Sequence, residues 1–188
     1  KGVWTIVVYH TAGYTANISA WSLNITYDTS TPDSPPSQPG TTYTGTAFDI
    51  AGNNVTTQTL NITDTGTISD INVVMSGSTT GSTQYFDITL QSPYGTIIEL
   101  TNLSSMNGNA FSSTTFDDEA STKITNGSAP YIGSFQPEGS LSAFDKEEMK
   151  GVWTIVVYHT AGYTANISAW SLNITYDTST PDSPPSQP

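Results

Sequence analysis

The sequence predicts an all-β protein built as a β-sandwich. Apolar and polar residues alternate with a period of two through many short segments, which is the pattern of half-buried strands. Clusters of Gly, Pro, Asn, Asp and Ser separate these segments, and long stretches of helical periodicity are absent. Many short strands between turn signals favour two packed sheets.

Residues 1–39 recur letter for letter as residues 150–188. A perfect match of this length does not arise by chance. Each copy predicts a pair of strands and then a linker; in the first copy the strands are 2–10 and 18–27. We assign self-assembly to the apolar residues of these strands. They are Val3, Trp4, Ile6, Val8, Trp21 and Leu23 in the first copy and Val152, Trp153, Ile155, Val157, Trp170 and Leu172 in the second.

One domain needs the duplicated strand pair once. Residues 40–188 contain a full set of parts, and residues 1–149 contain the same parts in circularly permuted order. Three explanations remain open: a window cut from a natural tandem array, exchange of strands between neighbouring chains, or an engineered duplication. Because a spare pair has open edges, the first two explanations are compatible.

The remaining elements follow in order along residues 28–149. Residues 28–43 form a Pro-, Ser- and Thr-rich linker of extended character that recurs at 177–188, and residues 44–176 form the folded domain. The predicted strands are 48–50, 56–63, 68–75, 84–91 and 97–100, with turns at 77–81 and 92–95, and the last two strands form a hairpin. A polar loop (101–113), a short acidic segment (114–120) and a long Gly/Pro/Ser-rich loop (121–145) precede the second copy of the pair.

Several motifs resemble the P domain, or Homo B domain, of the proprotein convertase and kexin-like family. The stretch Phe86-Asp-Ile-Thr-Leu-Gln-Ser-Pro-Tyr-Gly-Thr96 is similar to its Asp-Ile-x-Leu-x-Ser-Pro-x-Gly-Thr signature, and Thr115-Phe-Asp-Asp-Glu-Ala120 is similar to the acidic motif of its bacterial versions. Residues 133–144 are similar to its Pro-x-Gly-x-Leu-x-x-Phe stretch, and residues 151–155 and 169–174 to its closing strands. One departure is Asp145-Lys-Glu-Glu-Met-Lys150, which replaces the usual Asp-Gly-Lys or Asn-Gly before the Gly-x-Trp strand.

The resemblance covers about residues 46–176 and implies a jelly-roll sandwich of eight or nine strands. In kexin- and furin-like proteases this domain follows a subtilisin-type catalytic domain and stabilises it, and it is not catalytic itself. Bacterial and archaeal versions also occur on other secreted enzymes and in surface proteins. The resemblance therefore implies an extracellular or cell-surface location.

The composition excludes several classes of function. The chain has four lysines, no arginine and 16 acidic residues, with a net charge of −12. Nucleic acids and anionic membranes both need basic surfaces, so we expect neither as a partner. No apolar run approaches the roughly 20 residues of a membrane span, so no membrane insertion is expected. There is no cysteine for disulfides or thiolate metal sites.

We expect no catalytic residues. A serine protease needs Ser, His and Asp within reach of one another, and each repeat offers one histidine, His159 or its copy His10, at a strand end. Neither a Gly-x-Ser-x-Gly elbow nor a Gly-rich phosphate loop is present. Trp153 and Trp170 suggest a sugar platform, but their places in the closing strands favour core packing.

Acidic residues offer a candidate structural calcium site. Three adjacent acids repel one another unless they are splayed, solvated or neutralised by a cation, and Ca²⁺ takes six to eight oxygen ligands. The candidate ligands are Asp87, Asp117, Asp118, Glu119 and Glu138. The alternative is a solvated acidic edge. We expect the acids at 145–148 to form a solvated turn.

Asn-x-Ser/Thr sequons predict glycosylation at exposed positions in an exported protein. The candidates are Asn54, Asn61, Asn102 and Asn126. An Asn- and Thr-rich β protein also forms such sequons by chance.

The functional expectation is a non-catalytic, extracellular P-domain repeat with a structural or adhesive role. It would self-associate as a tandem array or filament through strand-pair complementation, with itself or neighbouring repeats as partner. One alternative is an accessory domain that stabilises a secreted subtilisin-like serine protease or recruits its substrates. Another is a lectin-like module that binds cell-surface glycans.

Overall fold

The computed structural model describes residues 40–178. Six strands form one sheet: β1 (Thr41–Gly45), β2 (Phe48–Ile50), β4 (Thr67–Thr79), β7 (Ala110–Phe116), β8 (Gly133–Phe135) and β10 (Ala165–Asp177). Four strands form the other: β3 (Asn54–Ile62), β5 (Phe86–Gln91), β6 (Ile97–Thr101) and β9 (Gly151–His159). Three short 3₁₀-helices are η1 (Thr83–Tyr85), η2 (Ile124–Asn126) and η3 (Leu141–Phe144). No helix in these residues is long and apolar enough to cross a membrane.

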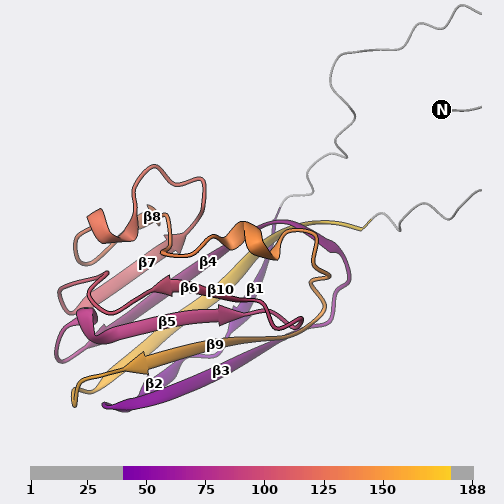
Figure 1. Cartoon of the computed structure of the whole chain (residues 1–188). Helices are drawn as coiled ribbons and strands as arrows, with labels where there is room; N and C mark the ends of the chain where they lie inside the picture. Colours follow the sequence, from indigo (N-terminus) through magenta and orange to yellow (C-terminus); the bar gives the residue numbers. More distant parts are fainter. Residues whose placement is uncertain (1–39, 179–188) are drawn as a thin grey trace, which may run out of the picture. The chain divides into compact units, whose positions relative to one another are not determined.

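The two sheets pack face to face as a sandwich, which confirms the predicted fold class (Figure 1). The six-stranded sheet has the order β1-β10-β4-β7-β8, with β2 also paired to β10, and the four-stranded sheet has the order β3-β9-β5-β6. All pairs are antiparallel except β7 with β8. Inward side chains of both sheets form one apolar core.

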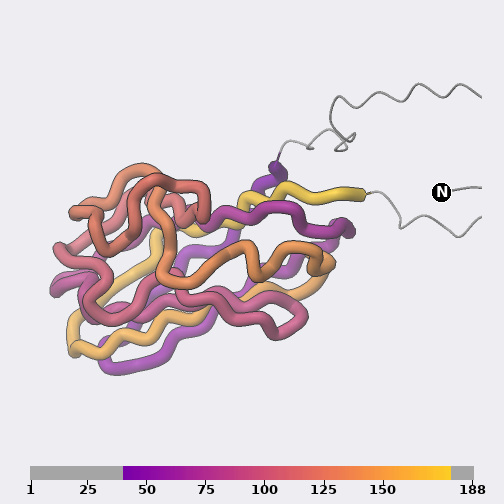
Figure 2. The backbone as a smooth tube through the Cα atoms, turned by 45° about the horizontal axis from the view of Figure 1, so that its top comes forward, coloured from indigo at the N-terminus to yellow at the C-terminus, as the bar shows by residue number. Residues whose placement is uncertain are grey.

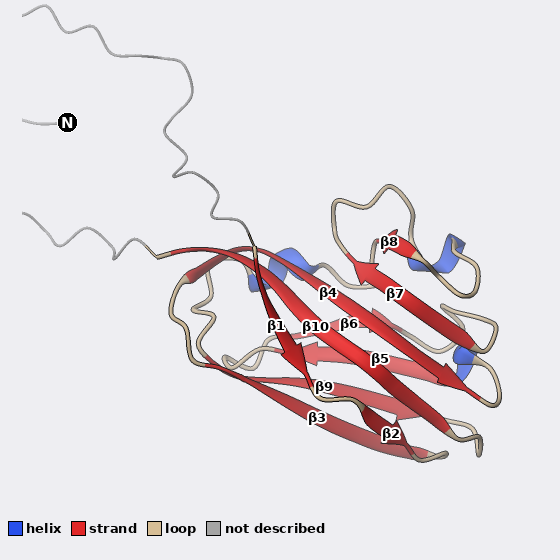
Figure 3. Cartoon of the chain, turned by 180° about the vertical axis from the view of Figure 1, so that it is seen from behind, coloured by secondary structure: helices blue, strands red, loops and turns tan. Residues whose placement is uncertain are grey.

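The closing strands β9 and β10 do not pair with each other. The loop between them crosses from one sheet to the other, and each strand is paired on both of its edges. β9 lies between β3 and β5, and β10 lies between β4 and the two short strands β1 and β2. The predicted strand pair is therefore an inter-sheet unit rather than a hairpin, and it supplies an interior strand to each sheet (Figure 3).

β9 and β10 each contribute a buried tryptophan to the core of the sandwich. Trp153 is 0% exposed, and its indole Nε1 donates to the carbonyl of Met149 at 3.0 Å. The Trp153 ring lies edge-on to Phe144, with centroids 5.2 Å apart. Trp170 is 1% exposed and donates to the carbonyl of Thr46 at 3.1 Å. Both tryptophans are core residues, so neither offers an exposed platform for a sugar.

A β-bulge in β10 changes which residues face inward. The register with β4 shifts between Ile167 and Ala169. Because the extra residue reverses the alternation, Ile167 and Trp170 are both buried although they are three positions apart. A regular period of two predicts that Trp170, Leu172 and Ile174 face the core, but it places Ile167 on the opposite face.

Several predicted boundaries were wrong. Strand β1 begins at Thr41, inside the predicted linker 28–43, because these residues pair with β10. Strand β4 continues to Thr79 through a predicted turn, since residues 77–79 also pair with β10. Residues 110–113 of the predicted polar loop belong to β7.

The long predicted loop 121–145 contains β8, η2 and η3. The hairpin of β5 and β6 is confirmed. Predictions for the first copy of the pair and for most of the linkers lie outside the described residues. They include those for Val3, Trp4, Ile6, Val8, Trp21 and Leu23.

Candidate functional site

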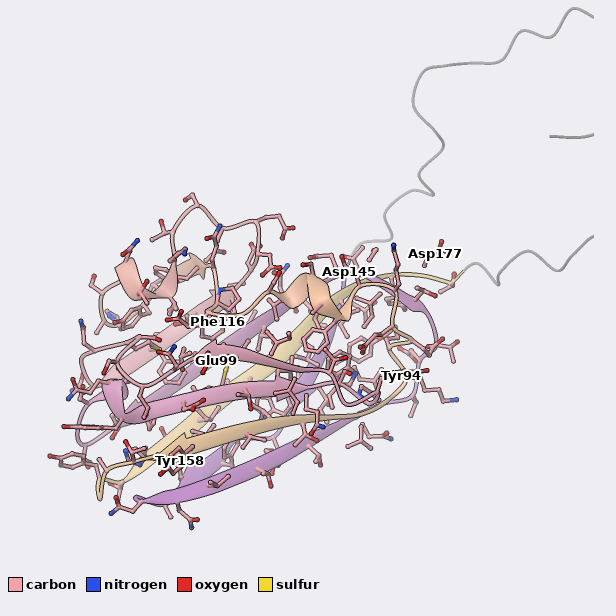
Figure 4. The ribbon with its side chains drawn as sticks, in the orientation of Figure 1. Tyr94, Glu99, Phe116, Asp145, Tyr158 and Asp177 are labelled. Atoms are coloured by element: carbon pink, nitrogen blue, oxygen red, sulfur yellow. The ribbon has the colours of Figure 1, made fainter. Side chains whose placement is uncertain are left out.

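A pocket of about 360 Å³ gathers carboxylates from three parts of the fold. Asp70 comes from β4, Asp145 follows η3, and the run Asp117–Glu119 follows β7. The remaining wall comes from Ser69, Asn72, Leu141 and Ser142. Figure 4 shows Asp145 beside η3, on the side of the sandwich where the long loop lies. Five acidic side chains therefore share one small surface depression.

Asp118 is the structural anchor of this pocket. Its carboxylate accepts hydrogen bonds from the Ser140 hydroxyl at 2.6 Å and from the amides of Leu141 and Ser142 at 3.0 and 2.9 Å. Burial acts to raise the pKa of Asp118, but these hydrogen bonds outweigh it, and the pKa lies below its usual value. Asp118 thus fixes the start of η3 to the end of β7.

Three neighbouring carboxyl groups have raised pKa values. Burial is the main cause for Asp70, followed by the charges of Asp117 and Asp145. For Asp145 the causes are burial and then the charge of Asp118, which Lys146 partly offsets. For Glu119 the main cause is its hydrogen bond with Asp117. The pocket therefore carries more negative charge than its own groups neutralise.

The amide of Asn72 lies in the same pocket. Its Nδ2 donates to Asp70 at 3.2 Å, whereas its Oδ1 is buried and has no hydrogen-bond partner. A buried acceptor without a donor is unfavourable. Donors or cations that enter the pocket would therefore find an unused oxygen beside the carboxylate of Asp70.

The structure does not bring the five predicted calcium ligands together. Asp87 lies on β5 in the other sheet, opposite Tyr158 of β9, and Figure 4 shows Tyr158 at the opposite end of the molecule from Asp145. Glu138 accepts from the Ser105 hydroxyl at 2.5 Å and lines a second pocket together with Asp118. Within residues 40–178 no group of three carboxylate or imidazole side chains is arranged to hold a metal ion.

Asp70 and Asp145 are the pocket residues that sequence reasoning missed. Asp145 was expected in a solvated turn, and it lies instead against the acidic segment. Asp70 lies on the outer face of β4, where alternation places it beside Asn72, and this alternation was the available signal. The pairing of β4 with β7, which brings Asp70 near Asp117, is not visible in the sequence.

His159 is the one histidine among the described residues, and it has no catalytic partners. It is 0% exposed, neither ring nitrogen has a hydrogen-bond partner, and its ring lies against Phe86 with centroids 4.9 Å apart. Burial lowers its pKa. A triad histidine needs a hydroxyl on one nitrogen and a carboxylate on the other, so His159 is a core residue.

The four candidate glycosylation sites differ in exposure. Asn54 and Asn61 are exposed on β3, and Asn126 is exposed in η2. Asn102 is partly buried, and its Oδ1 accepts from the Ser105 hydroxyl at 2.5 Å. Three of the four sequons are therefore accessible to a glycosylating enzyme.

Two solved structures to which this chain is similar are both of a serine protease from Aeromonas sobria. One is 15% identical, with a TM-score of 0.44, and the match covers 77% of this chain and 28% of that chain. The other, of the same protease and its chaperone in complex, is 14% identical with a TM-score of 0.44, covering 76% of this chain and 28% of that chain. No curated protein matches.

A family model described as the proprotein convertase P-domain matches residues 68–174, which is more than half of the chain. The match runs from the start of β4, through the acidic segment and the loop that carries η3, into the closing strand β10. The sandwich architecture agrees with it. The chain therefore belongs to the proprotein convertase P-domain family.

Proposed function

We propose that this chain is a non-catalytic structural repeat of a secreted tandem-repeat protein. Its domains would associate into an array or filament through the closing strands, with an adhesive role at the cell surface. One observation carries the proposal. The sequence that occurs twice forms β9 and β10, and each of these strands occupies an interior position in one of the two sheets.

We call the place of β9 between β3 and β5, together with the place of β10 between β4 and β1, the slot. Burial of apolar side chains favours the closing strands in this slot. The buried apolar residues that they contribute are Trp153, Ile155, Val157, Ala165, Ile167, Trp170, Leu172 and Ile174. Burying one large aliphatic or aromatic side chain is worth about 1.5–3 kcal/mol. A copy of these strands outside a slot leaves all of that surface in water. Filling the equivalent slot of a neighbouring domain removes it from water and joins the two domains.

The sequence between the closing strands and the next domain suits a spacer. Residues 28–39 contain four prolines, and Pro-rich segments extend by about 3.1 Å per residue. Rigid sandwiches that alternate with semi-rigid spacers form an extended chain, which is the shape that a stalk or filament needs.

Molar mass measured by light scattering across a concentration series tests this proposal. We expect multiples of the 20.0 kDa chain that grow with concentration. Trp4→Asp places a charge in the first copy and should abolish the larger species, whereas Tyr94→Asp, at a site that is 65% exposed, should leave them unchanged. A strict monomer at every concentration would contradict self-association through the strands.

Family membership supports a second candidate function. P domains accompany subtilisin-like catalytic domains, so this chain would stabilise a secreted serine protease or recruit its substrates. The full-length coding sequence separates the two candidates. A subtilisin-type catalytic domain would favour the accessory role, and uninterrupted 149-residue repeats would favour the structural one.

We further propose that the acidic pocket takes up a divalent cation such as Ca²⁺. The support is its five carboxylates, the raised pKa values of three of them, and the unpartnered Oδ1 of Asn72. Because no three carboxylates converge, one or two would bind directly and water would complete the ligand set. A higher melting temperature in calcium than in chelator supports this, and an unchanged one contradicts it.

A further inference from the structure

The ends of the folded domain lie side by side. Strand β1 is antiparallel to β10, with Thr41 opposite Ile174. The chain therefore enters the first strand and leaves the last strand at the same end of the sandwich, as Figures 2 and 3 show from two directions. Neighbouring strands are about 4.8 Å apart. A short connection is enough to join the end of β10 to the start of β1.

The sequence provides such a connection. Tyr27, the equivalent of Tyr176, is separated from Thr41 by residues 28–40. Antiparallel neighbours need only 2–5 connecting residues, and this segment is longer than that. A strand with the sequence 18–27 in the place of β10 would thus continue into β1 without strain.

The other connection of the closing strands is the one between Met149 and β9. The residues before it are held in place without a covalent link to the strand in the slot. Met149 is fully buried, and its amide donates to the carbonyl of Gly66 at 2.9 Å. The preceding turn is held to β4 by hydrogen bonds from Lys146 to Ile68 at 2.8 Å and from Ile68 to Glu147 at 2.9 Å. These contacts do not involve β9, and the one hydrogen bond from β9 to Met149, donated by the Trp153 indole, would come from Trp4 when the first copy is used. Residues 145–149 would therefore keep their place when β9 comes from elsewhere in the chain.

We infer that the slot of β9 and β10 accepts either copy of the closing strands within one chain. Residues 151–177 fill it in the described arrangement, and residues 2–27 fill it in a circularly permuted arrangement of the same sandwich. This inference rests on the proposed function, because it specifies which copies of the closing strands can fill the slot. In an array, each closing pair would complete either the repeat before it or the repeat after it, and the displaced copy would be free to join a neighbour.

Tryptophan substitutions in the intact 188-residue chain test this inference. Trp153→Ala removes a fully buried ring from the second copy, and Trp4→Ala makes the same change in the first. We expect each single variant to melt close to the unmodified chain, because the intact copy fills the slot. The variant with both changes should melt lower by about 10 °C or more, because neither copy of the closing strands then keeps its tryptophan.

Melting temperatures measured across a range of protein concentrations distinguish filling of the slot within one chain from filling between chains. Single variants that melt near the unmodified chain at every concentration, as monomers, support completion from either side. If Trp153→Ala alone lowers the melting temperature as far as the double change, the inference is overturned. It is also overturned if Trp153→Ala recovers only as oligomers form, a result that leaves donation between chains, and with it the proposed function, intact.

Discussion

The closing strands and the acidic pocket are two regions of one sandwich with opposite energetics. Inward residues of β9 and β10 are apolar apart from His159, and burial of apolar surface is the main source of their stability. The pocket holds five carboxylates that repel one another, so ions and pH act there. The stabilising element is duplicated in the sequence, whereas the charged region occurs once within the chain.

The largest expected effect concerns a core residue that the duplication does not cover. Phe86 on β5 is 1% exposed and packs edge-on against Phe111. Phe86→Ala should lower the free energy of unfolding by about 3–5 kcal/mol, because no second copy of β5 exists to replace it. Chemical denaturation measures the change. Tyr94→Ala, at an exposed site, is the control and should change stability by less than about 0.5 kcal/mol. Equal effects of the two changes would contradict the core assignment.

Removal of the Asp118 carboxylate should have the next largest effect. Asp118→Ala leaves the Ser140 hydroxyl and two amides of η3 without their acceptor, and it should lower the free energy of unfolding by about 1–3 kcal/mol. The loss should fade as the pH falls below about 4, since the lowered pKa of Asp118 stabilises the fold only while the unfolded carboxylate is ionised. Asp117→Ala is the matched neighbour, and a larger effect there would argue against Asp118 as the anchor.

His159 should make the stability depend on pH at values above those at which the carboxylates titrate. Its pKa is lowered by burial, so the unfolded chain binds a proton first as the pH falls. Stability should be complete above about pH 6.5 and decline below it by up to about 1.4 kcal/mol per pH unit. A variant with phenylalanine at both His10 and His159 should show a flatter profile between pH 7 and 5.5. An unaltered profile would place the titrating group elsewhere.

Asp70→Asn should have the smallest effect, and it should stabilise. The substitution removes one charge from the pocket and keeps an oxygen to accept from Asn72, so stability at pH 7 should rise by less than about 1 kcal/mol. Calcium should then raise the melting temperature less than it does in the unmodified chain. If the variant is less stable and calcium raises its melting temperature as much as that of the unmodified chain, Asp70 does not contribute to the repulsion between carboxylates in the pocket.

Regular alternation made the strands and their apolar faces predictable. The motifs at residues 86–96, 115–120 and 133–144, together with the closing strands, were enough to identify the family, and β5 and β6 were found with their hairpin. The bulge near Ser168 was not predictable, because an extra residue leaves no compositional signal. The pocket was half predictable: the run 117–119 is visible, but its meeting with Asp70 and Asp145 depends on pairing between distant strands.

Engineered disulfides would test most directly whether either copy of the closing strands fills the slot. Thr59 of β3 lies opposite Thr154 of β9, and Thr5 is the equivalent residue in the first copy. Directly opposed residues of antiparallel strands have Cα atoms about 4.5–5.5 Å apart, within reach of a disulfide, and the chain has no other cysteine. Two chains would be oxidised, one with Thr59→Cys and Thr154→Cys, the other with Thr59→Cys and Thr5→Cys.

We expect an intrachain disulfide in both chains at low concentration, with interchain bonds appearing in the Thr5 chain as concentration rises. A complete disulfide through Thr154→Cys and none through Thr5→Cys would show that only the second copy enters the slot, and it would contradict the account.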